Sequence, residues 1–472
     1  MRLGELAGAG GDSSVTGFAL DHRKVAPGNV FGAFRGAAFN GEDFIAEAVK
    51  RGAIAVVADT GAKVPDGTLA ILDDEPRRRF AELAARYYGP YPETVVAVTG
   101  TNGKTSSVEM ARQMWRMLGH RSASIGTLGV TTADDQVKTG LTTPDIVTFL
   151  NNMAGLKRMG ISHVAYEASS HGLDQHRAEG VPLKAVGFTN FSRDHLDYHQ
   201  TMDAYFEAKM QLVGRLAEPG AAAVVWADDP KSGEVIARAR ARGLKLLTVG
   251  EKGETIRLAS RTSSPLGQKL LLEHDGKEYP LTLPLIGSYQ AANVLVAAGF
   301  VLATGGAWRD VLSAMGRVSP VRGRLERAVI TPAGAPVYVD YAHTADALEA
   351  AIAALRPHVE GKLITVFGAG GDRDTGKRAP MGEVAARSSD VVIVTDDNPR
   401  SEDPAAIRKA VMAGAPGAIE IGGRREAIAE ALKMAKAGDI VLLAGKGHEQ
   451  GQIVGDTVLP FDDADVAREV AA

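Results

Sequence analysis

The sequence contains no cysteine, which excludes disulfide bonds, thiol catalysis and cysteine-ligated zinc. It also lacks a strong excess of charge, because 53 Lys and Arg stand against 57 Asp and Glu, for a net charge of -4. Such a balance offers no large basic surface, so we expect no nucleic-acid partner. The N-terminal segment MRLGELAGAGG has no continuous apolar run of the kind that forms a secretory signal, so we do not expect export.

Long apolar runs are also scarce. The stretch from Tyr279 to Trp308 carries no charge, but Ser288, Gln290 and Asn293 interrupt it. Its apolar portion is nearer the roughly 10 to 14 residues of a buried core helix than the ~20 residues that a bilayer span requires. We therefore predict a buried helix here and no association with a membrane.

The chain length indicates several domains. At 472 residues the chain exceeds one ordinary hydrophobic core and predicts about three domains. Hydrophobic residues at 45% and charged residues at 23% are typical of globular proteins, which argues against disorder or a coiled coil. A proline-rich segment at 88–92 and a second break at 320–324 separate predicted domains over residues 1–89, 90–321 and 322–472.

The pattern of strands and helices predicts an α/β protein. After residue 94, short apolar runs alternate with glycine turns and helical segments, which is typical of a parallel sheet covered by helices. We predict a central phosphate-loop-type domain with a mostly parallel sheet, a Rossmann-like doubly wound C-terminal domain and a smaller N-terminal α/β domain. Ligands of open α/β sheets bind beyond the carboxyl ends of the strands, so the residues that follow the apolar runs are the candidates for chemistry.

The residues after Val95–Thr99 resemble a phosphate-binding loop. They read Gly100, Thr101, Asn102, Gly103, Lys104 and Thr105, and an amphipathic helix follows. The glycines would let backbone N–H groups approach phosphate oxygens, Lys104 would reach the β and γ phosphates, and the Thr105 hydroxyl would bind magnesium. Val98 occupies the place of the usual first glycine. The alternative is a glycine turn with a solvated lysine, which the strand–loop–helix context disfavours.

Further polar residues follow the next apolar runs. Glu167 comes directly after the run 163–166, and a carboxylate at such a strand end can hold Mg²⁺, which prefers oxygen ligands. Another run, 185–188, leads into a segment that contains His195. From the residues alone, His195 is a turn or packing residue and Lys209 an ordinary lysine on a helix surface.

Together these motifs resemble those of the Mur ligase superfamily, and the resemblance extends over nearly the whole chain. The members that act in peptidoglycan precursor synthesis are cytoplasmic enzymes whose three domains bind a UDP-sugar, ATP and an amino acid, roughly in that order. The resemblance implies an ATP-dependent ligase that joins meso-2,6-diaminopimelate to the D-glutamate γ-carboxylate of UDP-N-acetylmuramoyl-L-alanyl-D-glutamate through an acyl phosphate. It also implies a monomer that requires Mg²⁺.

The resemblance assigns roles to particular residues. Thr105, Glu167 and His195 match magnesium ligands, and Lys209 matches a metal-binding lysine carbamate formed with CO₂, which would replace a repelling ammonium with an anion. The implied catalytic residues are Lys104, Glu167, His195 and Lys209. The positions that match ATP contacts are Gly100, Thr101, Asn102, Gly103, Lys104, Thr105, Ser106, Asn293, Arg324, Asp340 and His343. The positions that match UDP-sugar contacts are Thr142, Thr143, Ser169, Gln175 and Arg177.

The C-terminal domain would select the amino acid. The motif Asp397, Asn398, Pro399, Arg400 matches members that use meso-diaminopimelate, whereas the same tetrapeptide in isolation is usually a loop turn. A guanidinium can hold the distal carboxylate that distinguishes diaminopimelate from lysine. Further implied contacts are Arg373, Gly445 and Glu449, of which Glu449 would pair with the ammonium.

Some positions depart from the family pattern. His22 stands where serine is common, Leu141 precedes the threonine pair, and residues 287–290 replace a glycine-x-phenylalanine-asparagine start. Two alternative functions remain open at this point. One is another ligase of the superfamily, such as a folylpolyglutamate synthase. The other is a nucleotide-switch or transport ATPase that couples hydrolysis to motion.

Overall fold

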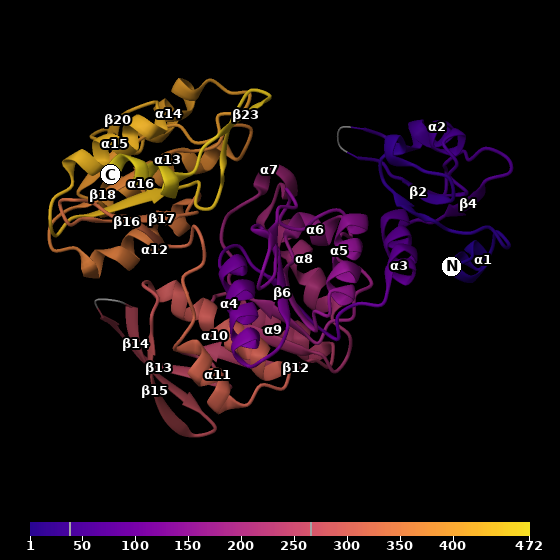
Figure 1. The fold of residues 1–472 in the computed structure, drawn as a ribbon, viewed down its shortest axis with the longest axis horizontal. Helices are drawn as coiled ribbons and strands as arrows, with labels where there is room; N and C mark the ends of the chain where they lie inside the picture. The colour runs from indigo at the N-terminus through magenta and orange to yellow at the C-terminus, as the bar shows by residue number, and fades with distance from the viewer. Residues whose placement is uncertain (37–38, 265–266) are drawn as a thin grey trace.

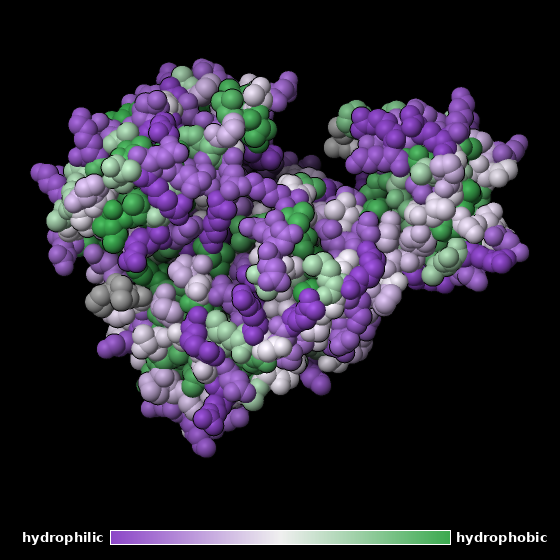
Figure 2. All heavy atoms as spheres, viewed as in Figure 1, coloured by the Kyte–Doolittle hydropathy of each residue, from purple (hydrophilic) through white to green (hydrophobic). Residues whose placement is uncertain are grey.

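The computed structural model describes residues 1–36, 39–264 and 267–472. Figure 1 shows three α/β units, each built on its own main sheet: the N-terminal unit at the right, the central unit below and the C-terminal unit at the upper left. The central unit adjoins both of the others. Figure 2 shows an open gap between the N-terminal and C-terminal units, above the central unit.

The N-terminal unit contains a small, fully parallel sheet. Helix α3 (Pro76–Tyr88) begins with a proline at its first turn and buries Phe80 and Leu83 in a core that it shares with the central unit. This shared core attaches the two units, because α3 packs against both β3 and the central helix α5 (Ile146–Arg158). The strands, in sheet order, are β1 (Gly17–Ala19), β2 (Asn29–Ala33), β3 (Ala55–Ala58) and β4 (Leu69–Leu72).

The central unit contains an eleven-stranded sheet whose middle is parallel. The parallel strands are, in sheet order, β13 (Ile256–Ser264), β12 (Lys245–Gly250), β11 (Ala222–Trp226), β10 (Ala185–Phe188), β5 (Thr94–Thr99), β9 (His163–Glu167) and β6 (Ser122–Gly126). The antiparallel edges are β14 (Gly267–His274) and β15 (Lys277–Leu283) at one end, and β7 (Gly129–Thr131) and β8 (Gln136–Val137) at the other.

Helices cover both faces of the parallel strands. On one face, α4 (Lys104–Met117) and α10 (Ser288–Ala303) pack against each other and share one core. On the other face, α5 and α8 (Met202–Gln211) contribute to the core that reaches the N-terminal unit. The carboxyl ends of β5, β9 and β10 therefore open at one edge, where the predicted site residues follow them.

The prediction of one buried helix across Tyr279–Trp308 is only partly correct. The helix α10 is buried from Gln290 to Val301, as expected. The first residues of the stretch instead form part of β15, in which Leu281 and Leu283 point into the core at the two-residue period of a strand. In the described parts of the chain, no helix is long and apolar enough to cross a bilayer.

The C-terminal unit is doubly wound. Helices α12 (Ala345–Leu355), α13 (Arg378–Ser388) and α14 (Pro404–Met412) cover one face, and α15 (Arg424–Met434) and α16 (Asp463–Ala471) the other. The strands, in order, are β16 (Glu326–Ile330), β17 (Pro336–Asp340), β21 (Ile440–Ala444), β18 (Leu363–Phe367), β19 (Val391–Val394) and β20 (Ile419–Glu420), all parallel except β16. The predicted α/β class, mostly parallel central sheet and doubly wound C-terminal sheet are confirmed.

Candidate active site

A cavity of about 300 Å³ lies between the central and C-terminal units. It is the place where most of the predicted nucleotide and metal residues meet, although they come from distant parts of the sequence. The predicted residues that line it are Thr101, Asn102, Gly103, Lys104, Thr105, Ser106, Thr142, Glu167, Ser169, His195, Lys209, Asn293, Arg324, Asp340 and His343.

The phosphate loop joins β5 to α4 and requires glycine at two positions. A Cβ atom on Gly100 would lie 1.9 Å from Thr189 Oγ1, and one on Gly103 would lie 2.3 Å from Asn293 Oδ1. Lys104 folds back over the loop, and its Nζ donates to the carbonyl oxygens of Gly100 at 2.9 Å and Thr101 at 2.8 Å. Burial lowers the pKa of Lys104, against the opposing charge of Glu167. The loop thus presents one cation beside the first turn of a helix, the arrangement that favours phosphate.

Glu167 occupies the carboxyl end of β9 and is held by its neighbours. Its carboxylate accepts hydrogen bonds from the backbone N–H of Thr127 at 2.8 Å and from the Thr127 hydroxyl at 3.2 Å. The close approach requires Gly126, since a Cβ there would lie 2.1 Å from Glu167 Oε1. Glu167 and Lys104 line the same cavity.

Lys209 is not the surface lysine that its helical context suggests, because its exposed fraction is only 1%. Its Nζ donates to the Gly100 carbonyl oxygen at 2.7 Å and lies 4.3 Å from the ring centroid of Tyr205. Burial lowers the pKa of Lys209 well below its usual value, and the charge of Lys104 adds to this shift. A neutral amine is therefore accessible in this position.

His195 lies just before α7 (Leu196–His199) with a positive φ of 53°. Burial lowers its pKa, while the adjacent Asp194 opposes that shift. A neutral imidazole has a free lone pair, which is the form that binds a metal.

The C-terminal unit supplies three residues to the cavity. Arg324 reaches across and its Nη2 donates to Thr105 Oγ1 at 3.0 Å. Asp340, at the end of β17, accepts from the backbone N–H of Leu325 at 2.7 Å, and burial raises its pKa. His343 Nε2 lies 3.8 Å from the Asp194 carboxylate of the central unit. The two units thus contact each other through charged groups around the phosphate loop.

The predicted UDP-sugar residues fall into two groups, one that lines the cavity and one that lies beside or behind it. Thr142 and Ser169 line the cavity. Thr143 is buried behind them, where its hydroxyl donates to the Glu167 carbonyl oxygen at 2.8 Å. Arg177 donates to the Thr143 carbonyl oxygen at 3.2 Å and to Gln175 Oε1 at 2.6 Å, so these residues brace one another beside the cavity.

The predicted amino-acid residues are not among those lining this cavity; they follow β18, β19 and β21 in the C-terminal unit. The residues 397–400 pair with the hairpin of β22 (Gly451–Val454) and β23 (Thr457–Pro460): the Arg400 N–H donates to the Ile453 carbonyl oxygen at 3.0 Å. Arg400 has a φ of 52°, and its Nη1 donates to the Gly371 carbonyl oxygen at 2.8 Å. Arg373 lies in the loop that follows β18, which contacts this segment through the Gly371 N–H and the Asn398 carbonyl oxygen, and its Nη1 donates to the Asp372 carbonyl oxygen at 3.3 Å.

Sequence reasoning assigned no role to two buried charged residues. Asp194 lies 3.5 Å from His195 and faces His343; burial opposes its ionisation, but these histidines and Lys377 lower its pKa. Asp194 could have been found from the sequence, because it lies between strand β10 and the predicted site residue His195. Lys446 contacts Asn398 and Glu449, and in the sequence it lies between the predicted contacts Gly445 and Glu449.

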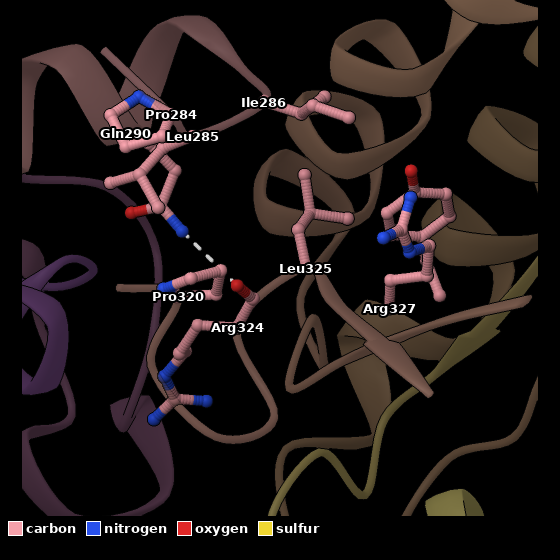
Figure 3. Close-up of a pocket in the computed structure, with 9 residues that line it drawn as sticks. Pro284, Leu285, Ile286, Gln290, Pro320, Arg324, Leu325 and Arg327 are labelled. Carbon is pink, nitrogen blue, oxygen red and sulfur yellow. Dashed lines mark hydrogen bonds between the residues drawn. The ribbon is translucent and has the colours of Figure 1, made fainter. Parts of the chain in front are cut away.

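A second cavity of about 130 Å³ lies at the connection between the central and C-terminal units. Figure 3 shows Gln290 of α10 donating to the Arg324 carbonyl oxygen, while the Arg324 side chain points away from the apolar residues around it. This bond, at 3.1 Å, ties the connecting segment to α10 and helps fix where the Arg324 guanidinium enters the nucleotide cavity.

Comparison with known proteins identifies the family. Residues 14–88 match the Mur ligase family catalytic domain, residues 98–301 the Mur ligase middle domain, and residues 323–447 the Mur ligase glutamate ligase domain. The chain therefore belongs to the Mur ligase family and is an ATP-dependent ligase, as its motifs predicted.

Its relatives carry a more specific name. The chain is 57% identical over 478 residues to a Zymomonas mobilis protein, covering 99% of this chain and 98% of that protein. It is 49% identical over 458 residues to a Caulobacter vibrioides protein, covering 96% and 94%. Both relatives are named UDP-N-acetylmuramoyl-L-alanyl-D-glutamate--2,6-diaminopimelate ligase.

Solved structures agree with the fold. A solved structure of a protein of that same name aligns with a TM-score of 0.73 at 32% identity, covering 100% of this chain and 98% of the other. A MurF ligase from Thermotoga maritima in complex with ADP gives a TM-score of 0.64 at 20% identity, covering 97% of each chain. A Mycobacterium tuberculosis folylpolyglutamate synthase gives 0.65 at 20% identity over 79% of this chain and 92% of the other. At such identity the last two comparisons support only the fold of the parts that they cover.

Proposed function

We propose that this ligase joins meso-2,6-diaminopimelate to the D-glutamate γ-carboxylate of UDP-N-acetylmuramoyl-L-alanyl-D-glutamate, at the expense of ATP. The observation that carries the proposal is the cavity in which the phosphate loop, a strand-end carboxylate and two lysines meet Arg324 of the C-terminal unit. The relatives with 57% and 49% identity carry the name of this reaction. The folylpolyglutamate synthase alternative is supported only by the shared fold.

The donor groups in the cavity fit a nucleotide with Mg²⁺. Lys104 and Arg324 would neutralise the triphosphate, and Asp340 and His343 would hold the nucleotide from the C-terminal unit, with Asn293 from α10. Within residues 1–36, 39–264 and 267–472, no three His, Asp or Glu side chains form a cluster ready for a metal ion. Mg²⁺ takes many of its ligands from phosphates and water, beside one or two carboxylates such as that of Glu167. Bound Mg²⁺ would offset charge on the phosphates.

Lys209 would supply a further ligand after reaction with CO₂. Carbamate formation needs a neutral amine, and the lowered pKa of Lys209, caused mainly by burial, favours that form. The resulting anion would stand beside Glu167, His195 and Thr105, the other proposed magnesium ligands. It would also remove the repulsion between Lys209 and Lys104.

The three units would divide the substrates among them. We propose units 1–89, 90–321 and 322–472, with the UDP-sugar at the first, ATP at the second and diaminopimelate at the third. Thr142, Ser169 and the braced Arg177 would hold the UDP-sugar substrate on the central unit, at and beside the cavity. Because one chain offers all three sites, we propose that it acts as a monomer in the cytoplasm, where ATP and the nucleotide sugar are available.

In the proposed reaction, Lys104 and Arg324 stabilise charge while the substrate γ-carboxylate attacks the γ-phosphorus of ATP. The product is an acyl phosphate, and ADP leaves. An amine of diaminopimelate then attacks the acyl carbon, phosphate leaves, and an amide forms. The Arg324–Thr105 hydrogen bond joins the C-terminal unit to the phosphate loop, and this contact would limit access of water to the acyl phosphate.

A three-way assay tests the proposal. Purified protein with ATP and UDP-N-acetylmuramoyl-L-alanyl-D-glutamate should release phosphate rapidly with diaminopimelate, and little with lysine or with no amine. Extension of folate, without activity on the nucleotide sugar, would favour the folylpolyglutamate alternative. Full ATP turnover without either second substrate would favour the nucleotide-switch alternative.

A further inference from the structure

Lys446 follows β21 in the loop assigned to the amino acid, and its side chain is 0% exposed. Its Nζ donates to Asn398 Oδ1 at 3.0 Å and to Glu449 Oε2 at 3.2 Å, and it lies 4.0 Å from Asp397 Oδ1. One buried ammonium therefore joins the segments 397–400 and 445–449.

The contacts of Asn398 fix the direction of its amide. Its Oδ1 accepts from Lys446 and from the Ile453 N–H at 3.0 Å, while its Nδ2 donates to Glu449 at 2.8 Å. An ammonium has only donors, so the oxygen must face Lys446 and the amide nitrogen must face Glu449. The side chain of Asn398 is thus held in place by three hydrogen bonds within the protein.

Glu449 stands between this network and solvent. Its side chain is 30% exposed, whereas Lys446 behind it is fully buried. The cluster combines the carboxylates of Asp397 and Glu449 with one ammonium, which leaves one net negative charge. A buried lysine is costly unless it is paired, and an apolar side chain of similar volume would suit a purely structural role better.

We propose that Lys446 is a positioning residue for the incoming amino acid. It holds Asn398 and Glu449 in one geometry, so that Glu449 presents a fixed carboxylate to the ammonium of diaminopimelate, and it limits the cluster to the single negative charge that this ammonium balances. The inference rests on the proposed function, because it deepens the role given there to Glu449.

The test compares Lys446→Met, Glu449→Gln and the double variant in steady-state kinetics, with thermal unfolding as the measure of folding. The matched control is Lys433→Met, which removes a lysine of α15 whose side chain is 79% exposed. We expect Lys446→Met to raise the KM for diaminopimelate about tenfold or more, the effect of losing a charged hydrogen bond. The KM values for ATP and for the nucleotide sugar should change less than about twofold, as for distant, independent sites.

The double variant distinguishes positioning from structural support. If Lys446 acts through Glu449, adding Lys446→Met to Glu449→Gln should raise the KM for diaminopimelate by less than about twofold, because coupled residues are not additive. Multiplicative effects, or equal changes in all three KM values, would overturn the proposal. So would the failure of both Lys446→Met and Lys446→Gln to fold. A wild-type enzyme that does not use diaminopimelate would instead refute the proposed function.

Discussion

Two lysines, Lys209 and Lys446, are equally buried and have opposite surroundings. Lys209 donates to a carbonyl oxygen and has a second lysine nearby, and no carboxylate of a described residue forms an ion pair with it. Lys446 contacts an amide oxygen and two carboxylates. Burial of a charge without a counter-ion favours the neutral form, whereas a paired charge can persist.

This difference suggests how each region works. The region around the phosphate loop, here called the nucleotide region, contains the amine of Lys209, which is suited to chemical modification. Phosphates and a cation would fill the cavity that this amine lines. In the amino-acid region the buried ammonium is already paired before substrate arrives, because Lys446, Asn398 and Glu449 contact one another. Removing a lysine should therefore affect the reaction in one region and substrate affinity in the other.

The largest expected effect is at Lys209. Lys209→Met should lower kcat by about 10²- to 10³-fold, the loss typical of removing one group that stabilises charge in a transition state. The thermal midpoint should not fall, because a methionine fills a similar volume without a buried unpaired amine. Steady-state rates and thermal unfolding measure the two quantities. The control is Lys231→Met, which removes a partly exposed lysine of the same unit and should leave kcat unchanged.

The second largest effect is expected at Arg400, in the region assigned to the amino acid. Arg400→Met should raise the KM for diaminopimelate about ten- to a hundredfold, from the roughly 1.5 to 3 kcal/mol of a charged hydrogen bond. The preference over lysine should shrink, since lysine has no distal carboxylate to lose. Arg387→Met, at an exposed arginine of α13, is the control. An unchanged ratio of kcat/KM for the two amines would mean that Arg400 does not select the substrate.

The two regions also differ in how many of their residue contacts could be predicted from the sequence. The phosphate loop is one contiguous segment between a strand and a helix, so Lys104 and Thr105 were placed by local pattern. The Lys446 network joins residues 48 positions apart, and only the parallel pairing of β-strands brings them together. The burial of Lys209 could not be predicted from the sequence either. Helical periodicity shows which residues share a face of α8, but not which part of the chain covers the end of the helix. The fold class and doubly wound sheet followed from alternation alone.

A smaller, reversible effect should follow from removing CO₂. In buffer depleted of CO₂ and bicarbonate, the wild type should lose part of its activity and recover it when bicarbonate is added. Only the neutral amine reacts, so activity at a fixed CO₂ concentration should fall as the pH falls through the lowered pKa of Lys209. Affinity for diaminopimelate, measured by calorimetry, should not respond to CO₂. Activity that does not change with CO₂ would contradict the carbamate on Lys209, and with it the proposed difference between Lys209 and Lys446.

The smallest effect concerns a buried charge outside both regions. Burial alone would raise the pKa of Glu179, but hydrogen bonds and charges from His176 and Arg215 lower it below its usual 4.5. A lowered pKa in the folded state adds stability above the unfolded pKa, and this stability is lost as the pH falls through the folded value. Glu179→Gln should therefore reduce the free energy of unfolding by about 1 to 3 kcal/mol at pH 7, and by less at pH 4. Denaturant unfolding at both pH values measures this, and all KM values should stay unchanged. An equal loss of unfolding free energy at both pH values would show that packing, rather than ion pairing, determines the effect of Glu179→Gln. It would then be weaker evidence that ion pairing explains the difference between Lys209 and Lys446.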